Sequence, residues 1–102
     1  MAYQINWTNR AWQTYETNIQ YLQEHWTEKE VRAFVWLTDK RISLLSERPL
    51  IGSPRNKRSS NIRFTLVHKR ILLIYKIKPR KKEIDLLVFW NTYQNPKRLK
   101  PR

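Results

Sequence analysis

The sequence predicts an α+β fold, in which an N-terminal strand and an α-helical hairpin pack on one face of a mainly antiparallel β-sheet. Residues 62–67, 70–78 and 83–90 are short runs rich in apolar side chains, which is typical of strands. Earlier in the chain, apolar residues recur every three or four positions over two longer stretches, the period of an amphipathic helix. Short polar turns at 68–69 and 78–82 connect the three strands as a meander. With 102 residues, the chain is long enough for one domain and too short for two.

The N-terminal elements follow from residue spacing. Residues 3–7 alternate between apolar and polar side chains and predict a short strand. Thr8 or Asn9 then caps a helix that runs to about His25. The side chains that this helix is expected to pack on the core are Ala11, Tyr15, Ile19, Leu22 and Trp26.

A second helix begins at Thr27, where Glu30 three residues later completes a capping-box pattern, and it ends at Pro49. Its expected buried face consists of Val31, Phe34, Val35, Thr38, Ile42 and Leu45. The following linker, residues 48–60, contains the only glycine, Gly52, and is expected to be exposed and basic.

Alternation along the strands predicts one apolar sheet face for the helices and a second face that is partly cationic. The residues expected on the helix-facing side are Ile62, Phe64, Leu66, Ile71, Leu73, Tyr75 and Ile77. The residues expected on the opposite side include Arg63, Lys76 and Lys78.

Charge is distributed very unevenly along the chain, whose formal net charge is +13. Residues 1–54 carry six basic and six acidic side chains, whereas residues 55–102, including the basic tail 91–102, carry fifteen basic and two acidic ones. Such a field predicts a nucleic acid, a ribosome or an acidic protein as partner. The candidate binding residues are Arg55, Lys57, Arg58, Arg63, Lys69, Arg70, Lys76 and Lys78.

Several chemistries are excluded or disfavoured by composition. The absence of cysteine excludes disulfides and thiolate ligands, and a single glycine excludes the phosphate-binding loops of nucleotide cofactors. His25 and His68 are too isolated for a metal site, so we expect neither a metal nor a cofactor. No apolar run approaches the ~20 residues of a membrane span and no signal peptide is present, so we expect a cytoplasmic protein that does not bind membranes.

The order strand, helical hairpin, three-strand meander resembles the RelE/ParE superfamily of toxins from type II toxin–antitoxin systems. The residues that carry the resemblance are Trp7 before Ala11, Tyr21-Leu22, Leu45 before Pro49-Leu50-Ile51-Gly52, Arg63, the run 71–75, and the run 89–99. Together they cover essentially the whole chain. The resemblance implies a growth-inhibiting toxin that an antitoxin, expected here to be acidic, keeps silent.

The resemblance leaves the target open. RelE-like members cleave mRNA on the ribosome and usually have an arginine three positions before the strand tyrosine, where this chain has Leu72. A later arginine of such sites is replaced by Tyr93 and an acidic residue by Asn91, while Arg63 does match a basic position. ParE-like members bind DNA gyrase without chemistry.

Cleavage of RNA would need groups that move protons, and the only candidates are His68, Tyr75 and Tyr93. Three hypotheses therefore stand: a toxin that binds an essential target such as gyrase, a ribosome-dependent endoribonuclease, and a non-toxic nucleic-acid-binding module.

Overall fold

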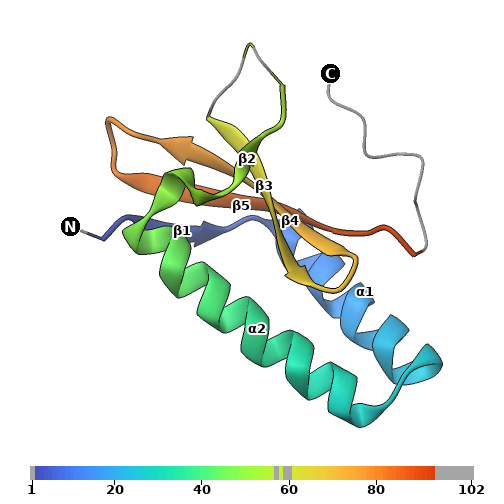
Figure 1. Ribbon diagram of the computed structural model, residues 1–102. Coiled ribbons are helices and arrows are strands. Elements are labelled where there is room, and N and C mark those ends of the chain that lie inside the picture. Colours follow the sequence, from blue (N-terminus) through green and yellow to red (C-terminus); the bar gives the residue numbers. More distant parts are fainter. Residues whose placement is uncertain (1, 57, 59–60, 94–102) are drawn as a thin grey trace.

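A computed structural model describes residues 2–56, 58 and 61–93. The elements are β1 (Gln4–Trp7), α1 (Asn9–His25), α2 (Glu28–Glu47), the 3-10 helix η1 (Pro49–Ile51), β2 (Ser53–Pro54), β3 (Ile62–His68), β4 (Ile71–Lys78) and β5 (Glu83–Asn91). The strands form one sheet in the order β1-β5-β4-β3-β2, with β1 parallel to β5 and every other pair antiparallel. Both helices cover the same face of this sheet (Figure 1). The predicted α+β class and the helical hairpin are confirmed, and no helix among the described residues has the length and apolarity to cross a bilayer.

Helix α1 is capped as predicted, because Thr8 Oγ1 accepts a hydrogen bond from the Ala11 N–H at 3.1 Å. Two polar side chains of α1 also reach the edge of β5. Thr14 Oγ1 accepts from the Phe89 N–H at 2.9 Å, and Asn18 Nδ2 donates to the Phe89 carbonyl at 3.1 Å. Strand β1 pairs with β5 only as far as Leu86, so α1 satisfies the β5 backbone where β1 has ended.

Helix α2 begins after Thr27 and ends at Glu47, close to the prediction. Its fully buried side chains include Phe34 and Leu45, but Val35, which was predicted to be buried, is 40% exposed. Only half of the capping box forms in the described contacts. Thr27 Oγ1 accepts from the Glu30 N–H at 3.4 Å, whereas the Glu30 carboxylate bonds to the sheet.

The predicted face of β3 is wrong. Thr65 and Val67 are buried, whereas Phe64 is half-buried and Leu66 is 50% exposed on the opposite face. The reason is the pairing with β4: Thr65 lies opposite Leu73, and directly paired residues share a face of the sheet. The core side of β4 is formed by Ile71, Leu73, Tyr75 and Ile77, all of which are buried. The face turned away from the helices is called the open face below.

The expected exposed linker contains more structure than predicted. Residues 49–54 form η1 and the short strand β2, and Gly52 between them is buried. An added Cβ at Gly52 would lie 2.5 Å from the Tyr75 hydroxyl oxygen and 2.8 Å from the Phe64 carbonyl oxygen. Glycine is therefore required here because the neighbouring atoms leave no room for a Cβ. The backbone conformation does not require it, since a φ of −74° is accessible to any residue.

Candidate functional site

Tyr75 lies at the centre of a hydrogen-bonded clamp that fixes the segment after α2. Its side chain is fully buried, and its hydroxyl donates to the Pro49 carbonyl at 2.7 Å and accepts from the Gly52 N–H at 3.0 Å. Burial raises the pKa of this hydroxyl above its ordinary value. In this conformation the Tyr75 hydroxyl is occupied by two backbone hydrogen bonds and does not face solvent.

Arg63 belongs to the same clamp. It lies opposite Tyr75 across the strands, and its Nη1 donates to the Gly52 carbonyl at 2.7 Å and to the Leu50 carbonyl at 3.3 Å. The prediction that Arg63 projects from the face away from the core is wrong, because the register of β3 places it on the side of Tyr75. Its guanidinium holds the clamp together.

His68 closes a second polar cluster, between β3 and the first turn of α2. It is 3% exposed, and its Nε2 lies 2.9 Å from Glu30 Oε1. Lys69 Nζ lies 3.3 Å from the other Glu30 oxygen and 4.4 Å from the centroid of the Trp26 ring. The hydrogen bond from His68 lowers the pKa of the Glu30 carboxyl, and the contact with Lys69 lowers it further by a smaller amount.

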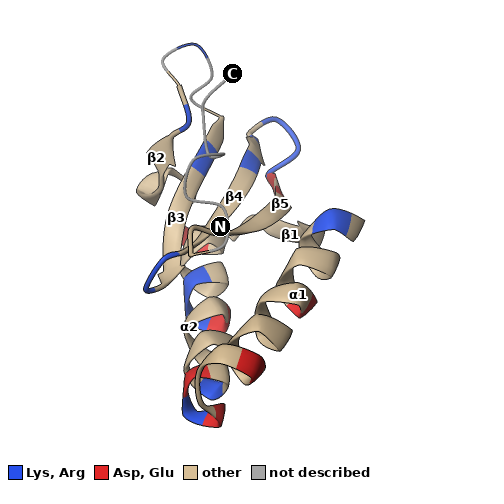
Figure 2. Ribbon diagram, turned by 90° about the vertical axis from the view of Figure 1, so that its right-hand side faces the viewer, with Lys and Arg blue, Asp and Glu red and all other residues tan. Residues whose placement is uncertain are grey.

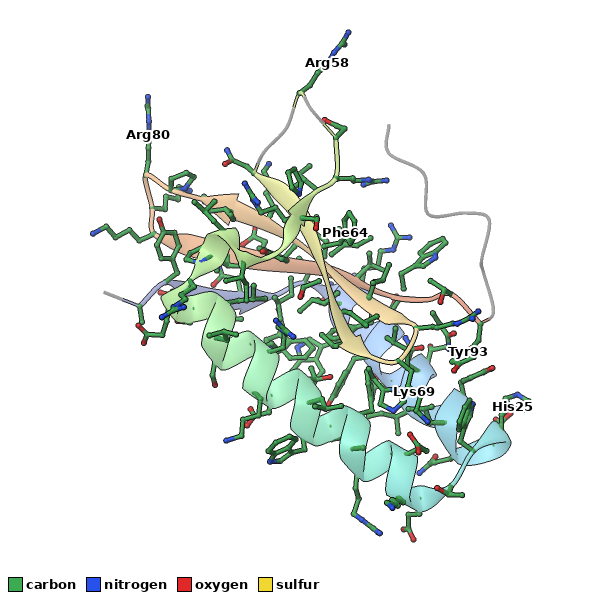
Figure 3. The ribbon with its side chains drawn as sticks, viewed as in Figure 1. His25, Arg58, Phe64, Lys69, Arg80 and Tyr93 are labelled. Carbon is green, nitrogen blue, oxygen red and sulfur yellow. The ribbon has the colours of Figure 1, made fainter. Side chains whose placement is uncertain are left out.

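Tyr93 is the most accessible of the three proton-transfer candidates. Its half-buried ring lies 5.5 Å from the Trp26 ring and 6.2 Å from the Tyr21 ring, with the Arg70 guanidinium 5.6 Å from its centroid. Figure 3 shows Lys69 and Tyr93 near the same end of the molecule, toward His25. The structure thus brings Lys69, Arg70 and Tyr93 to one end of the sheet, whereas it places Tyr75 elsewhere in the core.

The open face is divided into an apolar and a polar half. Paired positions place Leu66, Leu72 and Trp90 in one row and Phe64, Ile74 and Val88 in the next. This six-residue set is called the apolar patch below. Leu66 is exposed, Phe64, Leu72 and Trp90 are half-buried, and Ile74 and Val88 are buried. Beyond it lie Lys76, which is exposed, and Lys78, whose Nζ is 2.8 Å from Asp85 Oδ2.

The expected cationic sheet face is therefore reduced to two lysines among the described residues, and one of them is paired. The lysine holds the pKa of the Asp85 carboxyl below its usual range, with Asn6 Nδ2 donating to the same carboxylate at 3.0 Å.

The remaining predicted binding residues lie in the loop between β2 and β3. The Arg55 N–H donates to the Ile62 carbonyl at 2.8 Å, and its side chain is half-buried. Arg58 is exposed, and its backbone N–H donates to Asn56 Oδ1 at 2.9 Å. Lys57 and the tail from residue 94 lie outside the described residues. No spacing in the sequence relates Arg55 and Arg58 to a site, and the structure does not bring them to Tyr93.

Sequence reasoning missed two surfaces. A hollow of about 460 Å³ at the β4–β5 turn is lined by Asn61, Lys76, Ile77, Lys78, Pro79, Arg80 and Lys81. The sequence signal is Pro79-Arg80-Lys81-Lys82, which predicts a turn but does not indicate the hollow beside it. Figure 2 shows Lys and Arg gathered on this turn, whereas the helices carry both charges.

The second missed surface is a groove of about 450 Å³ on the helix side. It is lined by Trp7, Tyr15, Val31, Arg32, Val35, Trp36, Thr38, Asp39 and Ile42. Trp36 is 59% exposed, so apolar surface remains uncovered on this side as well. Among the described residues, no group of three or more His, Asp or Glu side chains has the arrangement of a metal site.

Comparison with solved structures relates this architecture to a known fold. A chain of the chromosomal ParDE TA system from P. aeruginosa superposes with a TM-score of 0.69, covering 88% of this chain and 96% of the other at 16% identity. No family model matches the sequence, and no curated protein matches it. The chain has the RelE/ParE fold, in agreement with the resemblance drawn from its sequence.

Proposed function

We propose that a chain with this RelE/ParE fold is the toxin of a type II toxin–antitoxin pair, acting in the cytoplasm by binding an essential protein target. DNA gyrase is the target class that a ParE-like toxin implies. The similarity to a chain of a ParDE TA system supports the toxin assignment through the shared fold. The choice between binding and RNA cleavage rests on the chemistry of the candidate residues.

The observation that carries the proposal is the burial of the groups that could transfer protons. Cleavage of RNA by its own 2′-hydroxyl needs a proton acceptor and a proton donor within hydrogen-bond reach of the reacting oxygens. Tyr75 uses its hydroxyl in two backbone hydrogen bonds, and His68 is 3% exposed and bonded to Glu30. Among the three, only Tyr93 is accessible, and a single hydroxyl does not supply both a proton acceptor and a proton donor at the two reacting oxygens. These contacts favour binding without chemistry.

The apolar patch is the surface we assign to the antitoxin. Leu66 is half exposed there, and a partner of mixed apolar and acidic character would cover the patch while meeting Lys76 and Arg70 beside it. The basic residues at the strand ends would then steer association, and the apolar contacts would supply most of the affinity.

The test is to express the chain without a partner and to measure two activities in parallel. We expect growth arrest with accumulation of gyrase-linked DNA breaks, and no mRNA cleavage in a purified translation system with ribosomes. Codon-specific mRNA cleavage that needs ribosomes would replace this proposal with the endoribonuclease. Growth without arrest at high expression would favour the non-toxic nucleic-acid-binding module.

A further inference from the structure

The turn between β4 and β5 is a hydrogen-bonded turn that carries positive charge. The Lys82 N–H donates to the Pro79 carbonyl at 3.3 Å and closes the turn, with Lys82 at a left-handed φ of 54°. The Lys82 carbonyl accepts from the Gln4 N–H at 2.9 Å, so β1 anchors the turn from outside. Arg80 and Lys81, at the two central positions, are therefore exposed on a fixed backbone.

The hollow beside this turn concentrates the charge. Asn61 closes one side, where its carbonyl accepts from the Ile77 N–H at 2.8 Å. Four cations, Lys76, Lys78, Arg80 and Lys81, line it, and Lys78 forms an ion pair with Asp85. Figure 3 shows Arg80 projecting from this end of the molecule, away from the helices, as Arg58 does from the neighbouring loop. The turn thus presents several cations in a shallow, open site.

An open hollow with spaced cations suits a ligand with repeated, solvated charges. A duplex nucleic acid presents one negative charge about every 1.7 Å of its axis, and phosphate contacts position such partners without reading sequence. Ile77 and Pro79 are the only apolar residues that line the hollow, and the aliphatic stems of its basic side chains form the rest of its apolar surface. An acidic peptide that needs apolar anchors fits the apolar patch better than this turn.

We propose that the β4–β5 turn, through Lys76, Arg80 and Lys81, binds the phosphate backbone of double-stranded DNA. This inference rests on the proposed function, because a gyrase-directed toxin meets its target on DNA, and a backbone contact would hold it at that complex. The site differs from the apolar patch assigned to the antitoxin.

The test uses the full chain made by cell-free translation and a 20-base-pair duplex of random sequence. Binding is followed by fluorescence anisotropy between 50 and 200 mM NaCl. The double variant Arg80→Glu, Lys81→Glu should lose at least ~10-fold in affinity, and its slope of log K against log salt should fall by about two. The matched control Lys29→Glu, Lys40→Glu makes the same charge change at exposed positions of α2 and should lose less than ~3-fold.

Equal losses in both double variants would overturn the site, because the effect would then depend on net charge alone. Tighter binding of a single-stranded RNA of the same length, lost in the turn variant, would replace DNA with RNA as the ligand. The milder pair Arg80→Gln, Lys81→Gln keeps the test valid if the glutamate pair unfolds, and it should reduce the salt slope in the same direction. Gyrase trapping is scored separately, so that DNA binding without trapping contradicts only the proposed function, and trapping without DNA binding contradicts only this site.

Discussion

Replacing Gly52 with alanine should destabilise the protein strongly, although the substitution adds one methyl group. The new Cβ would stand 2.5 Å from the Tyr75 hydroxyl oxygen and 2.8 Å from the Phe64 carbonyl oxygen, and real Cβ contacts are longer. Overpacking of this kind costs about 1–3 kcal/mol, and displacing the hydroxyl from the Gly52 N–H adds about 1 kcal/mol. We therefore expect a loss of about 2–4 kcal/mol.

Thermal unfolding followed by circular dichroism measures this loss. For a domain of this size, each kcal/mol shifts Tm by about 4–8 °C, so a loss of about 2–4 kcal/mol in Gly52→Ala should lower Tm by roughly 8–32 °C. The exposed neighbour Ser53 provides the control, and Ser53→Ala should change Tm by no more than ~2 °C. In a Tyr75→Phe background the methyl group no longer meets a hydroxyl, so the cost of Gly52→Ala should fall by about 1 kcal/mol. A Tm for Gly52→Ala within ~2 °C of the parent would refute the clamp as described.

Three further predictions follow from the other clusters. Glu30→Gln should destabilise the protein at pH 7, and the difference should shrink as the pH falls below 4.5. The His68 contact lowers the folded pKa of Glu30, so its stabilisation is complete above the ordinary value of 4.5 and disappears as the pH falls through the lower, folded pKa. Thermal melts of both proteins from pH 7 to pH 3 measure this, and a constant gap in Tm would contradict the assignment. Tyr93→Phe should leave growth arrest unchanged, whereas a loss of toxicity by ~10²-fold with retained target binding would indicate catalysis by the hydroxyl. Leu66→Lys should abolish capture of the antitoxin in co-purification with little change in Tm, because this side chain is 50% exposed, while the control Leu37→Lys on α2 should retain capture.

Helix caps and strand limits were predictable because they depend on local chemistry. Thr8 and Thr27 start the two helices as their side chains require, and Pro79 starts the β4–β5 turn. The face of β3 was not predictable from alternation, because both of its faces carry apolar residues. Ile62, Phe64 and Leu66 form the more hydrophobic set, yet the pairing of Thr65 with Leu73 turns that set away from the helices. Apolar residues at positions that the fold leaves exposed to solvent are expected at a binding surface.

The candidate site was less predictable than the fold, because its polar contacts join residues far apart in the chain. Nothing in the sequence indicates that Arg63 bonds to the Gly52 carbonyl or that His68 meets Glu30. The charge excess of the second half was visible, but its location on the β4–β5 turn required the register of β1 and β5. Arg80 and Lys81 were visible in the sequence as part of a turn, but the hollow beside them appears only in the structure.

The way α1 completes the edge of β5 limits how this protein can associate with itself. Molecules can join edge to edge into a continuous β-sheet fibre only if each molecule has two unpaired sheet edges. On the β5 side, the Tyr3 N–H donates to the Ser46 carbonyl, and the Tyr3 carbonyl accepts from the Ser46 hydroxyl. The four residues of β1 follow. Beyond β1, the Phe89 N–H and carbonyl bond to the side chains of Thr14 and Asn18. The β5 side therefore offers another chain only the short outer edge of β1. The longer edge is that of β3, which β2 covers only opposite Arg63 and Phe64, so we expect an added strand to pair there.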